Sequence, residues 1–384
     1  MSFWESEADV VNEHKTVLGK KNNLYRVCVN HQEICLYDAN VLYPPYGEVK
    51  QVPYGIVGIS EAVSVTIEAS FDVQKVEIQP VSLGLSQIVQ NNTVTFCVTK
   101  PCSITVHVND DFQKTLHLFF YDAQERFANQ KENVLYFGKG THDAGIINMQ
   151  DDQVIYLDDG AYVYGEIYAD HCKNIKIIGH GILSAENIPR LGRFDRRCID
   201  IIGCEQVEIK GITIHDSPTW TVRIMDCDQV DIEDIHIFGW RANSDGIDVC
   251  GSRNVSVNRC FIRNWDDSLV VKGLDTGDVL NVCFSNCIIW NDFGRPIEVG
   301  YENRADVINN IQFRDIHVIQ ALSGYPVMGI HQGDRAEISN VLFENIRIEH
   351  APGCQLFDLR IKPSAWNKEA RVGRIHDVLF RNIT

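Results

Sequence analysis

Three aspartates stand out in this sequence because their spacing could bring several carboxyl groups to one place. Asp266 and Asp267 are adjacent, and Asp245 lies about one turn of the repeat described below ahead of them. Like charges held close together raise the pKa of at least one carboxyl group, which then stays protonated near neutral pH. Cleavage of a glycosidic bond needs such an acid, and also a carboxylate that activates water or attacks the sugar. We therefore treat the three aspartates as candidate catalytic residues, although a lone aspartate in a turn more often caps backbone amides.

The elements that would position these carboxyl groups are short strands in an internal repeat. Each repeat has a branched aliphatic residue, a second strand residue two places on, a polar break and another short alternating strand. The aliphatic anchors recur every 21 to 37 residues, at Val154, Ile175, Val207, Val230, Val255, Val282, Ile311, Val341 and Val378. Because no helical pattern lies between them, a repeat cannot bury its apolar face alone and must stack on its neighbours. The predicted fold is all-β, a right-handed parallel β-helix.

Stacking turns the sequence alignment of the repeats into columns of side chains. Six segments align without a gap, beginning at Trp220, Asp245, Asp267, Arg295, Tyr325 and Phe357. Strand alternation points their third and fifth residues inward, and the first residues of the first four segments stand one above another in one column. The fourth residues form a second column of Arg223, Asp248, Val270, Glu298, Met328 and Arg360, and a third column contains Lys272 and Lys362. This alignment predicts a cleft with carboxylates at its middle and Arg and Lys on one side.

The N-terminal part of the chain has a different character. Short β-rich runs such as Ala62–Ile67 and Ser103–Val108 are separated by turn residues, which is typical of a β-sandwich. The polar stretch 122–132 is the expected linker. We predict an N-terminal β-sandwich domain over residues 1–125, followed by the β-helix over residues 126–384.

Charge and composition limit the classes of partner. The chain has 35 Lys and Arg against 52 Asp and Glu, a formal net charge of -17. This charge argues against nucleic acid or an anionic membrane surface as the partner, and no apolar run approaches the roughly 20 residues of a membrane span. We expect a carbohydrate substrate, and the chain ends allow a homo-oligomer. The histidines lack ligand spacing, so neither a metal nor another cofactor is expected.

The cysteines and the first residues bear on the compartment. The chain has 13 cysteines without paired CxxC spacing, and many lie in Val- and Ile-rich segments. Such residues are typical of reduced core thiols in a cytoplasmic protein. The start of the chain lacks a signal-peptide pattern. A secreted protein whose signal has been removed is the alternative.

Three motifs give the candidate site a family resemblance. Asn243-Ser-Asp-Gly-Ile-Asp248 resembles the NTDGID-type motif of polygalacturonases, and Trp265-Asp-Asp-Ser-Leu-Val-Val-Lys272 resembles their GDD-containing motif. Arg360-Ile-Lys362 is similar to their RIK motif, which binds the carboxylate of the substrate. The resemblance implies an inverting hydrolase in which Asp266 is the general acid, while Asp245 and Asp267 orient the attacking water.

One motif departs from the polygalacturonase pattern and leaves the substrate open. Where that family has a GHG motif, this chain has Gly294-Arg-Pro296. The stretch 290–301 and the preceding β-sandwich are more similar to the dextranase and isopullulanase family. The substrate is therefore either a galacturonan or a neutral glucan.

The candidate substrate-binding residues follow from these columns and motifs. Trp220 and Tyr301 flank the aspartates and are candidate platforms for sugar rings. Arg295, Arg360 and Lys362 are candidate contacts for a uronate carboxylate, because Arg suits bidentate carboxylate binding. The remaining candidates are Asn243, Asp248, Lys272 and Glu298. For Asp248, a structural role is the stronger alternative.

Two other function classes stay open. A polysaccharide lyase on the same scaffold would abstract a proton beside a uronate carboxylate, with Ca²⁺ held by acidic residues and an Arg or Lys as base. A non-catalytic glycan-binding or structural β-helix is the other. A lyase forms an unsaturated sugar, a hydrolase releases reducing ends, and a binding module does neither.

Overall fold

The N-terminal part of the chain forms two five-stranded sheets. The computed structural model describes residues 23–42, 47–124, 133–192 and 196–384. One sheet has the order β2-β1-β5-β8-β7, with β1 Tyr25–Val29, β2 Gln32–Glu33, β5 Val63–Ala69, β7 Ile88–Gln90 and β8 Thr93–Val98. The other has the order β3-β4-β10-β9-β6, with β3 Tyr37–Leu42, β4 Val49–Ile59, β6 Val76–Gln79, β9 Cys102–Val108 and β10 Leu116–Asp122. Two short 3-10 helices, η1 Val81–Leu83 and η2 Phe112–Lys114, accompany these strands. The apolar side chains between the sheets form one core, which confirms the predicted β-sandwich.

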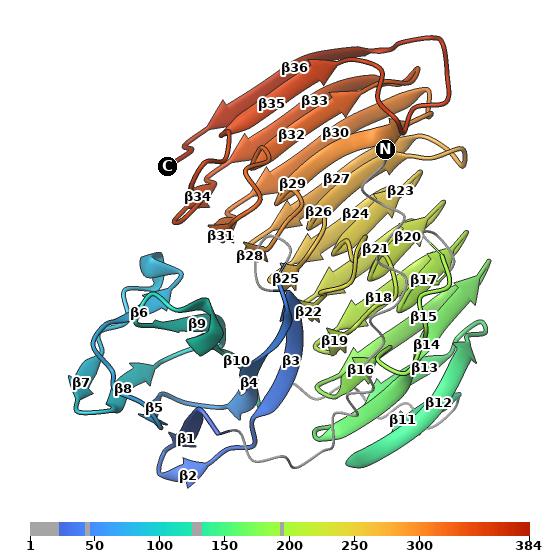
Figure 1. The fold of residues 1–384 in the computed structure, drawn as a ribbon. Helices are drawn as coiled ribbons and strands as arrows, with labels where there is room; N and C mark the ends of the chain where they lie inside the picture. Colours follow the sequence, from blue (N-terminus) through green and yellow to red (C-terminus); the bar gives the residue numbers. More distant parts are fainter. Residues whose placement is uncertain (1–22, 43–46, 125–132, 193–195) are drawn as a thin grey trace.

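The strands from residue 134 onward form a parallel β-helix (Figure 1). A ten-stranded parallel sheet contains β11 Val134–Phe137, β13 Val154–Leu157, β15 Lys173–Gly179, β18 Glu205–Lys210, β21 Asp228–Glu233, β24 Arg253–Asn258, β27 Val279–Ser285, β30 Val307–Arg314, β33 Glu337–Glu344 and β36 Arg374–Arg381. A second sheet begins from the long strand β14, Ala161–Asp170, which also pairs with β12, Gly140–Asn148.

Two runs of parallel strands extend from β14 and complete each coil. One run contains β16 Ile182–Ser184, β19 Thr213–His215, β22 His236–Phe238, β25 Phe261–Asn264, β28 Ile288–Asn291, β31 His317–Ala321 and β34 Arg347–Ile348. The other contains β17 Ile199–Ile202, β20 Val222–Met225, β23 Ile247–Cys250, β26 Leu269–Gly273, β29 Ile297–Asn303, β32 Met328–Gln332 and β35 Phe357–Ile361. The predicted fold class is therefore confirmed. The division at residue 125 stays a prediction, because residues 125–132 of the expected linker lie outside the described residues.

The recurring Asn-aliphatic pairs of the sequence have a structural cause. Asn254, Asn281 and Asn310 each have a left-handed backbone, with φ near 54°, 58° and 56°, a conformation that asparagine tolerates better than most residues. Their side chains stack: the Asn281 amide donates to Asn254 Oδ1 at 3.0 Å, and the Asn310 amide donates to Asn281 Oδ1 at 2.9 Å. This ladder fixes the same bend in each coil, so that the aliphatic residue that follows points into the core.

The register of the predicted columns is correct for four coils and wrong for the last two. Val222, Ile247, Leu269 and Ile297 are paired in succession and lie in the core. The next partners are Met328 and Phe357, whereas the alignment placed Val327 and Leu359 at these positions of the column. The second column therefore continues from Glu298 through Gly329 to Asp358, and neither Met328 nor Arg360 belongs to it.

The third predicted column is also wrong. Arg360 pairs with His331, while Lys362 lies two residues further on, where its backbone N–H donates to Gln332 O at 2.9 Å. A register shift between Val271 and Gly273 precedes this part of the helix. Bulges and turn insertions of this kind change the pairing without changing the period-two pattern, so a gapless alignment misses them.

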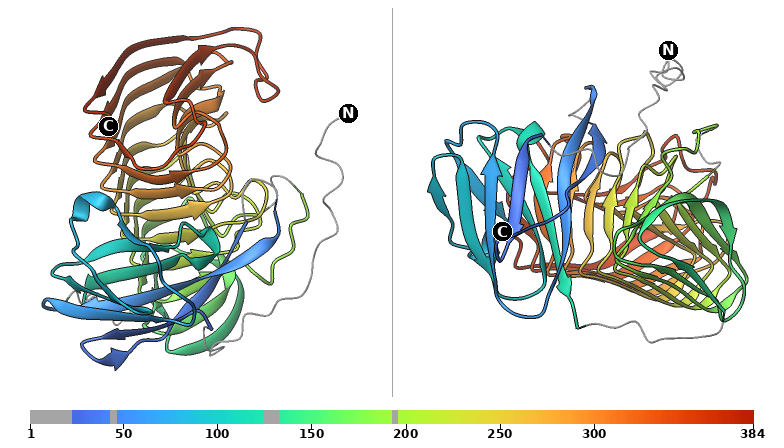
Figure 2. Two further views of the ribbon diagram at one scale, coloured as in Figure 1. Left: turned by 60° about the vertical axis from the view of Figure 1, so that its left-hand side comes forward. Right: turned by 90° about the horizontal axis from the view of Figure 1, so that it is seen from below.

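The β-sandwich packs beside the β-helix (Figures 1 and 2). The contact is aromatic, with Tyr54 and Phe119 of the sandwich against Phe238, Phe261 and Trp290 of the helix. No helical segment in the described ranges has the length and apolar character of a membrane-spanning helix.

Buried histidines lie at or next to this contact. Arg263 donates to His117 Nε2 at 3.1 Å, so the other ring nitrogen of His117 carries the proton and donates to Thr105 Oγ1 at 2.8 Å. His215 lies edge-on to Tyr54, and His236 stacks on Phe119. Burial lowers the pKa of His215 and of His236 to about 3, and lowers the pKa of His117 well below its ordinary value. The contact therefore holds neutral imidazoles.

We expect acid to destabilise the fold through these histidines. Their folded-state pKa values lie below the unfolded value near 6.5, so their contribution is complete above pH 6.5 and is lost as the pH falls toward 3. Each such histidine adds a slope of up to about 1.4 kcal/mol per pH unit. The free energy of unfolding, measured by denaturant titration between pH 7 and pH 4, should fall less steeply in His215→Leu. In His31→Gln, a control at an exposed position, the slope should match the wild type. An unchanged slope in His215→Leu would contradict this account.

Candidate active site

The three aspartates lie in turns of two adjacent coils. Asp245 precedes β23, and Asp266 and Asp267 lie in the turn between β25 and β26. Backbone hydrogen bonds join these turns directly: Gly246 N donates to Asp267 O at 2.8 Å, and Ser268 N donates to Arg295 O at 2.8 Å. Trp220, Asp245, Asp267 and Arg295 each precede a registered core residue by two positions. The structure therefore brings these four residues together as the alignment predicted.

Two asparagine side chains that sequence reasoning missed hold the Asp266–Asp267 turn. The Asn264 amide donates to Ser244 O, Asp266 O and Asp267 O at 2.9, 2.8 and 2.9 Å. The Asn291 amide, paired with Asn264 in the sheet, donates to Asp266 O at 2.6 Å. Both asparagines are fully buried. An Asn at the same place in consecutive repeats, just before an acidic turn, is the signal that could have found them.

Two glycines allow the turns to approach so closely. A Cβ at Gly294 would overlap the backbone of Asp266 and Asp267, and a Cβ at Gly246 would overlap Ser268 O. Neither glycine has a positive φ, so space between coils, and not backbone strain, requires them. The turn with the two aspartates is thus held between glycines on either side.

Asp266 is the most accessible carboxyl group of the three. It is partly exposed, whereas Asp245 and Asp267 are only 3% and 8% exposed. Its Oδ2 accepts a hydrogen bond of 3.3 Å from the Asn243 amide, and Asn243 Oδ1 accepts one of 2.8 Å from Arg190. Burial of the carboxyl group, and next the charge of Asp267, raise the pKa of Asp266 to about 7. Asp266 can therefore carry a proton near neutral pH.

Asp245 belongs to a buried ion cluster beneath the turn. Lys272 Nζ lies 3.1 Å from Asp245 Oδ2 and 3.0 Å from Asp248 Oδ1. Burial raises the pKa of Asp245, and the ammonium opposes this rise. Although burial alone would lower the pKa of Lys272, the charges of Asp248 and Asp245 raise it well above its ordinary value. One ammonium group thus forms ion pairs with two carboxyl groups.

Three predicted substrate-binding residues lie in or on this cluster and not at the surface. Asp248 is 0% exposed and Lys272 is 4% exposed. The Trp220 ring is 5% exposed, with Lys272 Nζ 3.7 Å and the Arg197 guanidinium 5.2 Å from its centroid. The prediction that Trp220 is an open platform for a sugar ring is therefore wrong in this structure. The ring instead covers the cation that pairs with Asp245.

Arg295 connects Asp267 to two tyrosines. Its backbone N–H donates to Asp267 Oδ1 at 2.7 Å, and its guanidinium lies 3.5 Å from the same oxygen. The guanidinium also donates to the Tyr301 hydroxyl at 3.0 Å, and it lies 5.0 and 4.6 Å from the ring centroids of Tyr301 and Tyr325. The two rings fix an arginine that remains partly exposed.

Glu298, Arg360 and Lys362 differ in their relation to the site. Glu298 is fully buried next to Arg295 and His331. Arg360 lies on β35, where its half-exposed side chain pairs with Asp358 at 2.6 Å. Lys362 is exposed, and the register separates it from Lys272. The structure therefore brings Arg360, but not Lys362, into the charged network that includes Arg295.

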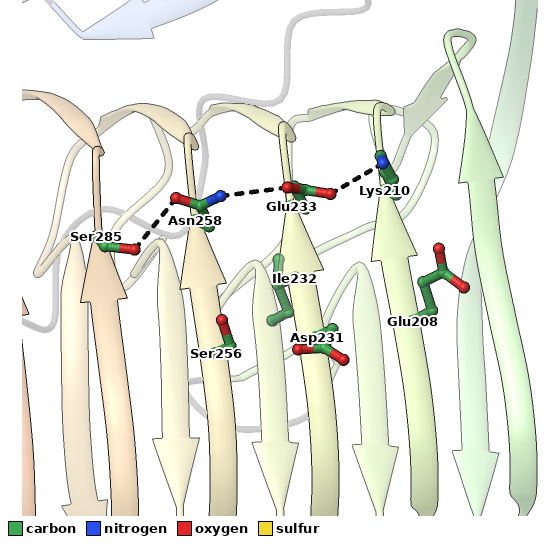
Figure 3. A pocket seen from close by; sticks show the side chains of 8 residues that line it. All are labelled: Glu208, Lys210, Asp231, Ile232, Glu233, Ser256, Asn258 and Ser285. Carbon is green, nitrogen blue, oxygen red and sulfur yellow. Dashed lines mark hydrogen bonds and ion pairs between the residues drawn. The ribbon is translucent and has the colours of Figure 1, made fainter. Parts of the chain in front are cut away.

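A separate polar hollow lies on the ten-stranded sheet (Figure 3). Its side chains satisfy one another: Lys210 pairs with Glu233 at 2.9 Å, the Asn258 amide donates to Glu233 at 3.2 Å, and Ser285 donates to Asn258 at 3.1 Å. This sheet does not contain the strands that carry the aspartates. Within the described residues, no group of His, Cys, Asp and Glu is arranged to hold a metal ion.

Comparison with known proteins identifies the family. Residues 183–384 match glycosyl hydrolases family 28, more than half of the chain. The protein belongs to this family, and the predicted resemblance to polygalacturonases is confirmed at the level of the family.

Individual relatives are distant. The chain is 24% identical over 221 residues to a polygalacturonase of Juniperus ashei, a match covering 56% of this chain and 41% of that protein. It is 22% identical over 239 residues to exopolygalacturonase B of Aspergillus niger, covering 55% and 53%. The chain thus spans about half the length, or less, of these curated relatives.

Solved structures show the same fold. Dex49A from Penicillium minioluteum superposes with a TM-score of 0.62 at 14% identity, over 97% of this chain and 91% of that chain. An exopolygalacturonase from Thermotoga maritima superposes with a TM-score of 0.55 at 16% identity, over 65% and 72%. At these identities the likeness concerns the fold.

We expect Gly294→Ala to displace the turn that carries Asp266 and Asp267. The new methyl group has no space, and overpacking of this kind costs about 1–3 kcal/mol. Gly277→Ala is the matched control, because its Cβ would meet nothing closer than 3.4 Å. Denaturant titration should show a loss of unfolding free energy in the first variant and little change in the second. Equal stability of the two variants would contradict the close approach described here.

Proposed function

We propose that this protein is an inverting glycoside hydrolase that cleaves O-glycosidic bonds in a galacturonan-type or glucan-type saccharide. The observation that carries the proposal is the partly exposed Asp266, with a pKa of about 7, beside two carboxyl groups that are paired with cations. Such an arrangement separates an acid from two bases within one site, as glycoside hydrolysis requires. Membership of glycosyl hydrolases family 28 supports the same reaction class.

Asp266 is the general acid in this proposal. Its proton passes to the glycosidic oxygen as the bond from that oxygen to the anomeric carbon breaks. Asp245 and Asp267 accept hydrogen bonds from a water molecule, whose oxygen attacks the anomeric carbon from the opposite face and whose proton passes to one of these carboxylates. Lys272 lies beside Asp245 and Arg295 lies beside Asp267, so each of these two carboxyl groups has a cation at hand to balance a carboxylate charge.

Two observations bear on the charge of the substrate. The partly exposed Arg295 and the half-exposed Arg360 could meet a uronate carboxylate, and the relatives named above are polygalacturonases. Both guanidinium groups, however, already face carboxylates of the protein, and the chain carries a net charge of -17, which repels a long polyanion. Both substrate classes therefore belong in the first assay.

A reducing compartment fits the cysteines. All 13 thiols are free, and most are buried in the core. Free thiols persist in the cytoplasm, whereas secreted proteins tend to form disulfides. We propose a cytoplasmic location, in which short oligosaccharides would be the natural substrates.

The direct test is hydrolysis with its stereochemistry. The wild-type protein should release reducing ends from oligogalacturonates or from glucan oligosaccharides, and NMR of the first-formed anomer should show inversion. Inversion is expected because two carboxylates are assigned to water and none to attack on the sugar. A retained anomer would contradict the assignment of Asp245 and Asp267. An unsaturated product would indicate a lyase.

We expect Asp266→Asn to lose turnover while it keeps substrate binding. An amide of the same shape cannot donate the acid proton, and general acid catalysis contributes about 10²–10⁴-fold. Because Asp266 must be protonated, wild-type kcat should fall as the pH rises through about 7. Asp231→Asn, on the exposed face of the ten-stranded sheet, is the control and should match the wild type. Steady-state kinetics and calorimetric binding make the comparison, and undiminished turnover in Asp266→Asn would reject the assignment.

A further inference from the structure

Six ionisable side chains of alternating charge run from the candidate site to the protein surface. In order they are Asp267, Arg295, Glu298, His331, Asp358 and Arg360. The successive separations are 3.5, 3.6, 2.6, 3.2 and 2.6 Å. The first member is the carboxylate that we assign to the attacking water, and the last is a half-exposed arginine.

The β-helix builds this chain from four consecutive coils, of which the first supplies Asp267 just before β26. Glu298 lies on β29, His331 on β32, and Asp358 and Arg360 on β35. Glu298, Gly329 and Asp358 are in register, and a Cβ at Gly329 would overlap the Glu298 carboxylate. The absent side chain at Gly329 thus leaves the space in which Glu298 reaches His331 Nδ1.

His331 is the middle cation of the chain and is almost fully buried. Its ring is 2% exposed and stacks on Tyr301, with 4.5 Å between ring centroids. The charged groups that face it are Glu298 and Arg295 from the preceding coil, and Asp358 and Arg360 from the following one. When both ring nitrogens carry protons, Nδ1 donates to Glu298 and Nε2 donates to Asp358.

The protonation of His331 therefore decides how Arg295 is shared. Glu298 is 0% exposed, and a buried carboxylate without a cation is costly. With His331 neutral, Arg295 would be the remaining cation close to Glu298, and it would be drawn from Asp267 toward Glu298. With His331 charged, Glu298 is balanced and Arg295 can stay on Asp267.

We infer that His331 is a positioning residue for the proposed hydrolysis: as an imidazolium it balances Glu298, and thereby keeps Arg295 against the carboxylate of Asp267. His331 does not touch the substrate in this role. The inference rests on the proposed function, because it concerns the base of that reaction.

The electrostatics of the site agree with a protonated His331. Although burial lowers the pKa of His331, its hydrogen bonds to Glu298 and Asp358 and the charge of Glu298 raise it above its ordinary value overall. A raised pKa means that the imidazolium, and its effect on Arg295, are present at lower pH and lost as the pH rises through that pKa. Two groups, Asp266 and His331, must then be protonated for full activity.

The test is the alkaline side of the pH profile of kcat/KM. Loss of two protons makes the wild-type logarithmic profile fall with a slope that approaches -2. In His331→Gln only Asp266 titrates, so the slope should approach -1, with kcat about 10- to 100-fold lower from the misplaced base and KM little changed. His376→Gln is the matched control: His376 also lies between two carboxylates, at 2.8 and 3.1 Å, but on the exposed strand β36. Its profile should match the wild type.

A second variant tests the inference independently, in case His331→Gln does not fold. Glu298→Gln keeps the shape of the side chain but removes the carboxylate that competes with Asp267 for Arg295. The protonation of His331 should then no longer affect Arg295, so the alkaline slope should fall to -1. The inference is overturned if folded His331→Gln retains the wild-type slope and kcat or loses only thermal stability, or if folded Glu298→Gln retains the wild-type slope. If the wild-type protein hydrolyses no glycan, the proposed function fails. An active wild type with an unchanged variant profile rejects the role of His331 alone.

Discussion

The structure depends on the hydrogen-bonded register between the turns that precede β23, β26 and β29. These turns carry the candidate acid and bases, and they stack by direct backbone hydrogen bonds from Gly246 to Asp267 and from Ser268 to Arg295. Side chains are excluded at Gly246 and Gly294 so that the backbones can meet. Residues on neighbouring coils consequently lie one strand spacing apart, which brings three carboxyl groups together without any loop having to fold over them. In a solenoid, the stacking of the repeats brings these groups together. The same stacking requires small residues where the turns touch.

The same stacking brings several carboxyl groups close together, and cationic side chains of the protein pair with them. Lys272 pairs with Asp245 and Asp248 under the Trp220 ring, and Arg295 pairs with Asp267 and Glu298. Asp266 has no such cation within ion-pair distance among the described residues, and burial raises its pKa to about 7. Side chains from the neighbouring coils therefore decide which carboxyl groups are paired with a cation and which is not. They give chemically identical side chains different charged partners within one site.

The sequence allowed much of this arrangement to be predicted, and particular residues show where prediction stopped. The aliphatic anchors gave the β-helix, and the register from Val222 to Ile297 followed from strand alternation. The register failed at Met328 and Phe357. Val327 and Met328 are both apolar and buried, and Phe357, Leu359 and Ile361 alternate, so the apolar pattern alone does not identify the residue of each run that pairs with the preceding coil. Period-two reasoning also separates inward from outward positions but says nothing about what covers an outward residue. Trp220 and Lys272 were assigned to the surface for that reason, yet both are buried. His331 lacked metal-ligand spacing, and its carboxylate partners on two other coils are visible only in three dimensions.

The alternating charges beyond Asp267 also constrain how the site could recognise a sugar acid. A uronate carboxylate that binds Arg295 must compete with Asp267 and Glu298, and one that binds Arg360 must compete with Asp358. Neither guanidinium is a free cation, so recognition of an anion would require these pairs to rearrange or to share their hydrogen bonds. A neutral sugar does not require these ion pairs to rearrange. It can accept hydrogen bonds from the side chains of Asn243 or Tyr301, both of which are partly exposed. Under the proposed hydrolysis, these charge pairs therefore place fewer demands on a neutral ring next to Asp266. Arg360, at the surface end of the chain of charges, is then the position where an acidic sugar would disturb the proposed catalytic groups least.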